Sequence, residues 1–132
     1  MSVSYVKIFN QIIHEFFNEL IDIFPEEPKM KVQYTLFQTI IKANAKKPAI
    51  EFMTKSLPYL EKIAMRDEQF FLSPDTPDFL QALNVQKIWA TVSDNTREMI
   101  WKYIQSFFTI GIKIVEMPQE THEIINYILN KS

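Results

Sequence analysis

The side chains in this sequence that could hold a metal ion are few and scattered. The 132 residues include two histidines, His14 and His122, and no cysteine. Neither histidine lies in an HExxH or ExxH motif, which would place two ligands on one helix face. Glu15, Glu19 and Asp22 share helical spacing, but a carboxylate metal site in a helical bundle also needs an ExxH partner on another helix. We therefore expect no metal and no cofactor, and we interpret the carboxylates as a hydrated face.

No pattern of residues indicates nucleophilic or phosphate-transfer chemistry. The chain has no G-x-S-x-G turn, and its serines and threonines fall at expected helix caps or on polar strips. Its single glycine cannot build an oxyanion turn or a glycine-rich phosphate loop. The lack of cysteine excludes thiolate nucleophiles, disulfides and iron–sulfur clusters. We therefore expect a protein that is not an enzyme.

A group of lysines is the feature that could contact nucleic acid. Lys42, Lys46 and Lys47 lie in "KANAKK", and Lys29 and Lys31 precede them. Exposed aromatic residues are not interleaved with these lysines, and arginine occurs only twice in the chain. The net charge of −2 gives no overall attraction to polyanions. We interpret the lysines as a solvated helix end that complements the helix dipole, with a nucleic-acid role for the Lys29–Lys47 region as an alternative.

Proline positions divide the chain into helices. Seven prolines and one glycine, with 47% hydrophobic residues, favour an all-α fold over one built on tight β-turns. We expect an irregular single-domain bundle of about six helices over residues 1–132, with "RDEQFFLSPD" as a loop or short extended piece. The first three predicted helices cover residues 4–24, residues 28 to about 43, and a segment from 48 that Pro58 kinks or splits. The next two cover residues 76–92 and about 95–116, the latter with a capping box of Asn95 and Glu98. The last predicted helix begins at Pro118.

Two of these helices carry more apolar surface than a single neighbour can cover. In the first helix and in the one over residues 95–117, apolar side chains cover roughly 220° of the circumference, about twice the stripe of a surface helix. Adjacent aromatic residues such as Phe16 and Phe17 therefore either wedge between different helices or face a partner. The candidate partner-binding residues are Phe16, Phe17, Trp101, Phe107 and Phe108. Gly111, near the centre of the second apolar face, predicts close approach of another helix backbone, with a hinge or a ligand gap as the alternative.

Three stretches of the chain together resemble a known group of proteins. They are "FFNELIDIFPEE", "KANAKKPAIEFMTKSLPYLEKIAMRDEQFFL" and "IWKYIQSFF". Their order and spacing are similar to small helical proteins of unknown function from large double-stranded DNA viruses, the giant viruses and their algal-virus relatives. The resemblance covers about residues 5–110 and implies a viral origin and a helical fold. It carries no active site, and the tail after Glu116 falls outside it.

The sequence favours an interaction protein over other classes. No secretory signal pattern is present, and the longest apolar stretch, "FFTIGIKIV", is too short to span a bilayer. We expect an intracellular protein (host cytoplasm, virus factory or virion if viral) that binds a protein partner or itself through an apolar helical surface. The alternatives are a nucleic-acid accessory factor and a small-molecule or lipid-binding bundle with its cavity between the aromatic pairs.

Overall fold

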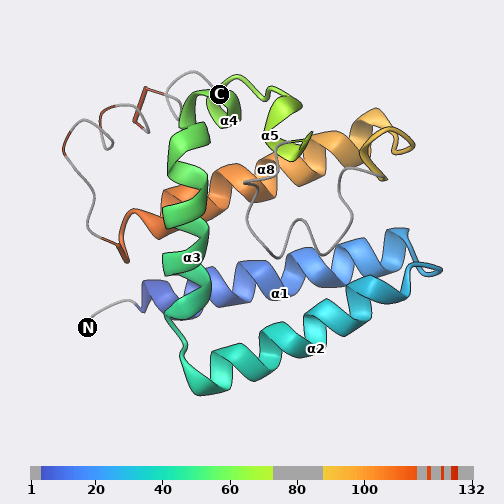
Figure 1. Ribbon diagram of the computed structural model, residues 1–132, viewed down its shortest axis with the longest axis horizontal. Coiled ribbons are helices and arrows are strands. Elements are labelled where there is room, and N and C mark those ends of the chain that lie inside the picture. Colours follow the sequence, from blue (N-terminus) through green and yellow to red (C-terminus); the bar gives the residue numbers. More distant parts are fainter. Residues whose placement is uncertain (1–3, 73–87, 116–118, 120–122, 124–125, 128–132) are drawn as a thin grey trace.

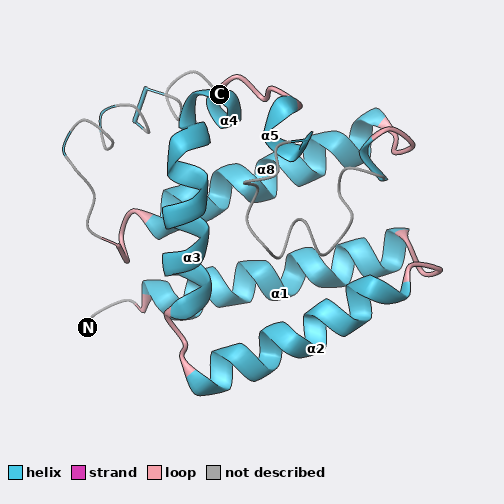
Figure 2. Ribbon diagram, viewed as in Figure 1, coloured by secondary structure: helices cyan, strands magenta, loops and turns pink. Residues whose placement is uncertain are grey.

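The helix boundaries follow from proline and from small polar caps, as the sequence predicts. The computed structural model describes residues 4–72, 88–115, 119, 123, 126 and 127. Helix α1 spans Tyr5–Ile23, and the Ser4 hydroxyl accepts a hydrogen bond from the backbone N–H of Lys7 at its start. Helices α2 (Pro28–Ala43) and α3 (Lys47–Ser56) each have a proline in the first turn, where no backbone donor is needed. These described residues are all-α (Figures 1 and 2).

The predicted break at Pro58 is confirmed. Because proline cannot donate a backbone hydrogen bond, helix α3 gives way to a 3₁₀ turn, Leu57–Tyr59, and then to helix α4, Leu60–Ala64. The prediction of a loop or extended piece after α4 is wrong in part, because Gln69–Leu72 forms the short helix α5. The Asp67 side chain accepts a hydrogen bond from the backbone N–H of Gln69 at 3.0 Å and so initiates this turn.

Helix α8, Asp94–Gly111, starts one residue earlier and ends earlier than the sequence predicts. Its cap is Ser93, whose hydroxyl accepts from the backbone N–H of Thr96 at 3.2 Å, so the proposed capping box of Asn95 and Glu98 does not form. Tighter turns after Gly111 end the helix before Glu116. The predicted helix over 76–92 lies largely outside the described residues, as does most of the one from Pro118.

Helix α1 lies between its neighbours and contacts α2, α3 and α8. Figure 1 shows α1 and α2 side by side as an antiparallel pair, with α3 crossing toward α8. With three neighbours, α1 can bury an apolar arc that a single neighbour could not cover. This arrangement explains the width of the apolar face, which in a surface helix would be about half as large.

The adjacent phenylalanines wedge between different helices. Phe16 packs on Tyr103 and Phe107 of α8, with ring centroids 5.0 and 5.7 Å apart. Phe17 packs on Phe37 of α2 at 5.6 Å and also on Tyr34. The adjacent pair Phe107 and Phe108 on α8 also packs against other helices. Phe107 contacts Phe9 of α1, and both Phe107 and Phe108 contact Phe52 of α3.

These packing contacts correct the assignment of a partner-binding surface to the aromatic residues. The exposed fractions of the side chains are 0% for Phe16, Phe17 and Phe107, 3% for Phe108 and 4% for Trp101. Trp101 packs against Phe70, Phe71 and Trp89 instead of facing solvent. All five form part of the folded core, so an interaction surface has to be sought elsewhere.

Gly111 does mark a close approach, as predicted, but the neighbour is a side chain rather than a helix backbone. A Cβ atom placed on Gly111 would lie 2.5 Å from Sδ and 2.9 Å from Cγ of Met53 on α3. Met53 is completely buried. The thioether therefore occupies the space that any larger residue at position 111 would need, which explains why α8 tolerates the flexible glycine there.

Tyr103 lies at the edge of this core beside the carboxylates of α1. Burial, the negative charge of Glu19, a hydrogen bond to the Glu19 carboxylate and the charge of Glu15 together raise the pKa of Tyr103 from 10.0 to about 12. Each of these effects disfavours the phenolate, so the folded protein holds this proton to a higher pH than the unfolded chain does.

This difference predicts a loss of stability at high pH. Between about pH 10 and 12 the unfolded chain releases the Tyr103 proton while the folded chain keeps it, so the free energy of unfolding falls as pH rises. Because the side chain is partly solvated, we expect a contribution of about 1 kcal/mol, less than the full shift would give. Urea unfolding at pH 8 and pH 11.5 should show a smaller loss for Tyr103→Phe than for the wild type. Equal losses would contradict the prediction.

Candidate functional site

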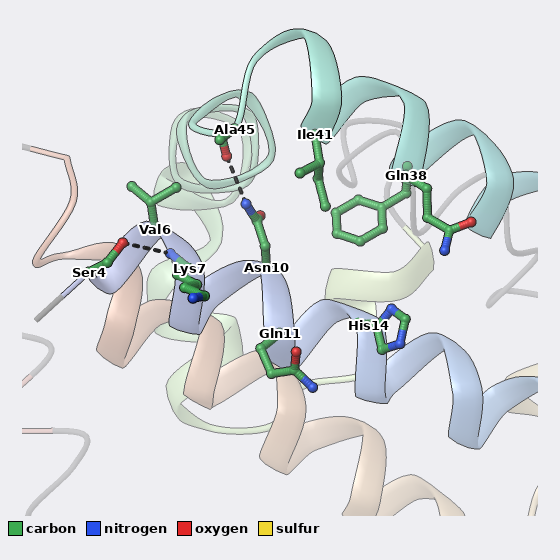
Figure 3. Close-up of a pocket in the computed structure, with 10 residues that line it drawn as sticks. Ser4, Val6, Lys7, Asn10, Gln11, His14, Gln38, Ile41 and Ala45 are labelled. Atoms are coloured by element: carbon green, nitrogen blue, oxygen red, sulfur yellow. Dashed lines mark hydrogen bonds between the residues drawn. The ribbon is translucent and has the colours of Figure 1, made fainter.

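A groove opens between the first half of α1 and the second half of α2. Its volume is about 360 Å³, which lies at the lower end of the range for small-molecule sites. The apolar part of its lining includes Val6, Phe37 and Ile41. The polar part includes Lys7, Asn10, Gln11, His14 and Gln38, and Figure 3 shows the α1 members in a row along the helix. We call this feature the α1–α2 groove.

Helical spacing brings these side chains together. Lys7, Gln11 and His14 recur at intervals of four and three residues and so share one face of α1. Gln38 and Ile41 do the same on α2. The small Ala45 follows α2 at one end of the groove and forms part of its lining. The groove therefore combines apolar side chains from both helices with hydrogen-bonding groups that come mainly from α1.

Asn10 is a buried polar residue in the wall of this groove, and it is not among the residues predicted from the sequence. Its side chain is 9% exposed, and its Nδ2 donates a hydrogen bond to the backbone carbonyl of Ala45 at 2.9 Å (Figure 3). Its Oδ1 is buried and accepts no hydrogen bond from the described residues. An unpaired buried acceptor costs roughly 1–3 kcal/mol. The signal that could have found Asn10 is its position on the helical wheel, outside the strip that Lys7, Gln11 and His14 define on α1.

His14 is held at the other end of the groove by a residue of α2. The Tyr34 hydroxyl hydrogen-bonds to the His14 ring, and the two rings meet edge to face with centroids 5.0 Å apart. A local hydrogen bond therefore holds His14, while His122 lies outside the described residues. Glu15, Glu19 and Asp22 are exposed on α1. Within the described ranges, no group of three His, Cys, Asp or Glu side chains could hold a metal ion.

The outward side of α2 forms a second candidate site. Val32 and Leu36, one helical turn apart, are 57% and 49% exposed. Ala43 is also exposed and continues the same stripe, because residues four and seven positions apart lie on one side of a helix. We call these three residues and their immediate surroundings the α2 outer face. Met30 and Phe37 occupy the opposite side of the helix and are buried in the core.

The lysines of the nucleic-acid alternative surround the connection from α2 to α3. Lys42, Lys46 and Lys47 are all exposed. Lys42 lies in the last turn of α2, where a cation complements the helix dipole as predicted. Lys46 and Lys47 instead cap and open α3, where a positive charge opposes the dipole. The helix dipole therefore accounts for the position of Lys42 only. The positions of Lys46 and Lys47 have to be explained in another way, such as by contact with an acidic partner.

Comparisons with known proteins identify no family for this chain. Neither the protein-family models, nor the curated proteins, nor the solved structures contain a match to the chain. The viral origin suggested by resemblance therefore stays a prediction. In the portion of the chain that the structure describes, no helix has the length and apolar character needed to cross a bilayer.

Proposed function

We propose that the protein is a non-enzymatic interaction protein that contacts its partner through the α2 outer face. The observation that carries the proposal is the pair of half-exposed aliphatic side chains, Val32 and Leu36, one turn apart on a helix whose other side is in the core. Helix-in-groove and helix-on-helix recognition use anchors with this spacing. The deeply buried phenylalanines hold the helix in place and do not meet the partner.

The charges around this face indicate the chemistry of the partner. Residues 28–50 contain five lysines and no aspartate or glutamate. On a helical wheel Lys29 adjoins the apolar stripe on one side, and Lys31 and Lys42 lie on the other side, beyond Thr35 and Thr39. Opposite charges at the rim of an interface speed association and fix its register. The fitting partner is therefore a protein helix with an aliphatic stripe and acidic margins.

A membrane surface and a nucleic acid fit this face less well. Helices that lie in a membrane interface bury large apolar residues such as Trp, Phe and Leu, whereas the α2 outer face combines Val32 and Leu36 with the polar Thr35 and Thr39. Single-stranded nucleic acids are bound through exposed aromatic side chains on which their bases stack. The phenylalanines of α2 and α8, which are Phe37, Phe107 and Phe108, are buried and so cannot stack on bases. If the viral resemblance holds, the partner would be a component of the virion or the virus factory.

Site-specific cross-linking in the native cell tests the proposal. A benzophenone amino acid at Thr39, which is exposed beside the stripe, should cross-link to one discrete protein whose contacting peptide is helical and acidic. The change Leu36→Lys should weaken this capture at least about tenfold, because burying a leucine is worth roughly 1.5–3 kcal/mol. The thermal midpoint should stay unchanged, since Leu36 is already half exposed.

The matched control is the same photoreactive residue at Met65, an apolar position that is 82% exposed on a different part of the molecule. It should not capture the same protein. Capture of the same proteins from Thr39 and Met65, or capture that persists in Leu36→Lys, would refute the α2 outer face as the contact surface. Cross-links to lipid or nucleic acid in place of protein would refute the partner class.

A further inference from the structure

We propose that the α1–α2 groove binds a small carboxylate that has an apolar body. This site is separate from the α2 outer face, so either proposal can fail without the other. Among the described residues that line the groove, Lys7 is the one lysine or arginine. No aspartate or glutamate is among them, so the groove favours an anion over a cation.

The distribution of the lining residues sets the orientation of the ligand. Lys7 lies near the amino-terminal end of α1, and His14 lies two helical turns further along (Figure 3). The Phe37 ring and the Ile41 side chain supply apolar surface on the α2 side of the groove. A ligand in this orientation would place its carboxylate beside the Lys7 ammonium group. Its hydrocarbon chain would then lie along the apolar side chains of Phe37 and Ile41.

Asn10 provides a second, independent reason to expect a ligand here. It is the buried side chain in the groove wall whose Oδ1 has no hydrogen-bond partner among the described residues. An orphaned buried acceptor is uncommon in folded proteins and calls for a specific explanation. This oxygen is covered in the structure, so a hydroxyl group on a bound molecule would pair with it only if the groove wall shifts. Hydroxylated fatty acids are thus the ligands that use every feature of the groove.

The test uses the full chain and compounds of defined chemistry. Decanoate, decanol and decyl phosphate are titrated separately into ¹⁵N-labelled protein while backbone amide shifts are followed by NMR. We expect saturable shifts for decanoate in residues 6–14 and 37–45, with decanol binding at least about tenfold more weakly because it lacks the charge. Tighter binding of decyl phosphate than of decanoate would overturn the carboxylate assignment. A hydroxylated acid, 3-hydroxydecanoate, should bind more tightly than decanoate.

Two variants and one control make the result decisive. The change Lys7→Gln should reduce decanoate binding to the level of decanol, while Lys102→Gln, at a lysine that is 69% exposed on α8, should leave it unchanged. The change Ala45→Phe should fill the groove and abolish binding, because position 45 uses only its backbone carbonyl to bond Asn10. Shifts that do not saturate, or saturable binding that survives both Lys7→Gln and Ala45→Phe, would refute the site.

Discussion

Replacement of Phe107 by alanine should lower the free energy of unfolding by about 3–5 kcal/mol, the range measured for large aromatic residues in packed cores. Phe107 is completely buried and lies where α1, α3 and α8 meet. Its ring contacts Phe9, Phe16, Phe52 and Tyr103, at centroid distances of 5.5, 5.7, 5.4 and 6.4 Å. Because the core is closely packed, these four rings cannot all shift to fill the cavity that alanine would leave at position 107.

Urea unfolding followed by far-ultraviolet circular dichroism measures this loss. Met65→Ala is the matched control, because Met65 is 82% exposed and its truncation should change the free energy of unfolding by less than about 0.5 kcal/mol. Sedimentation equilibrium on the same samples separates core from interface. A Phe107→Ala variant that keeps its stability but loses association would restore the partner-surface interpretation of the aromatic residues.

Replacement of Gly111 by valine should cost about 2 kcal/mol, within the usual range for overpacking a core. The new Cβ would have to displace Sδ and Cγ of Met53, which lie 2.5 and 2.9 Å from its position. Met53 is completely buried and cannot move its side chain into solvent. The strain therefore has to be absorbed by neighbouring side chains or by a shift of α3 against α8.

A double-mutant cycle identifies Met53 as the cause. Met53→Ala alone should destabilise the protein by creating a cavity, but in the Gly111→Val background its cost should be smaller by about 1–2 kcal/mol, since the valine occupies part of that space. The cycle is measured by urea unfolding of the four proteins. Strictly additive costs would show that valine acts through the local backbone of α8 and not through contact with Met53.

Local sequence was sufficient to predict most helix boundaries. Ser4 and Pro28 start α1 and α2, and Pro58 breaks the third helix, because a missing backbone donor or an added side-chain acceptor acts within one turn. The same local rules gave the wrong cap for α8. Ser93 and Asn95 both offer a capping oxygen, and the choice between them depends on where the packed helix begins.

The width of the apolar arcs also predicted that Phe16 and Phe17 would need different neighbours, and α8 and α2 supply them. The sequence left open whether a second chain was required. Among the described residues, α1 has three neighbouring helices that cover most of its apolar arc, and Ile23 at its end is 43% exposed. The five aromatic residues proposed from the sequence are buried, whereas Val32 and Leu36 are among the large apolar residues that the described structure exposes.

The sequence by itself determined the helical class, the proline breaks and the amphipathic faces, because these depend on hydrogen bonding and spacing over one or two turns. Only the tertiary structure decided that Asn10 is buried against Ala45, 35 residues away, and that Lys7 borders a groove with Ile41. Such pairings depend on how α2 is rotated against α1, and a rotation of one helical position would exchange buried and exposed side chains without changing the hydrophobic composition. Periodicity defines the apolar face of each helix, but the packing of all the helices together selects the contacts between them.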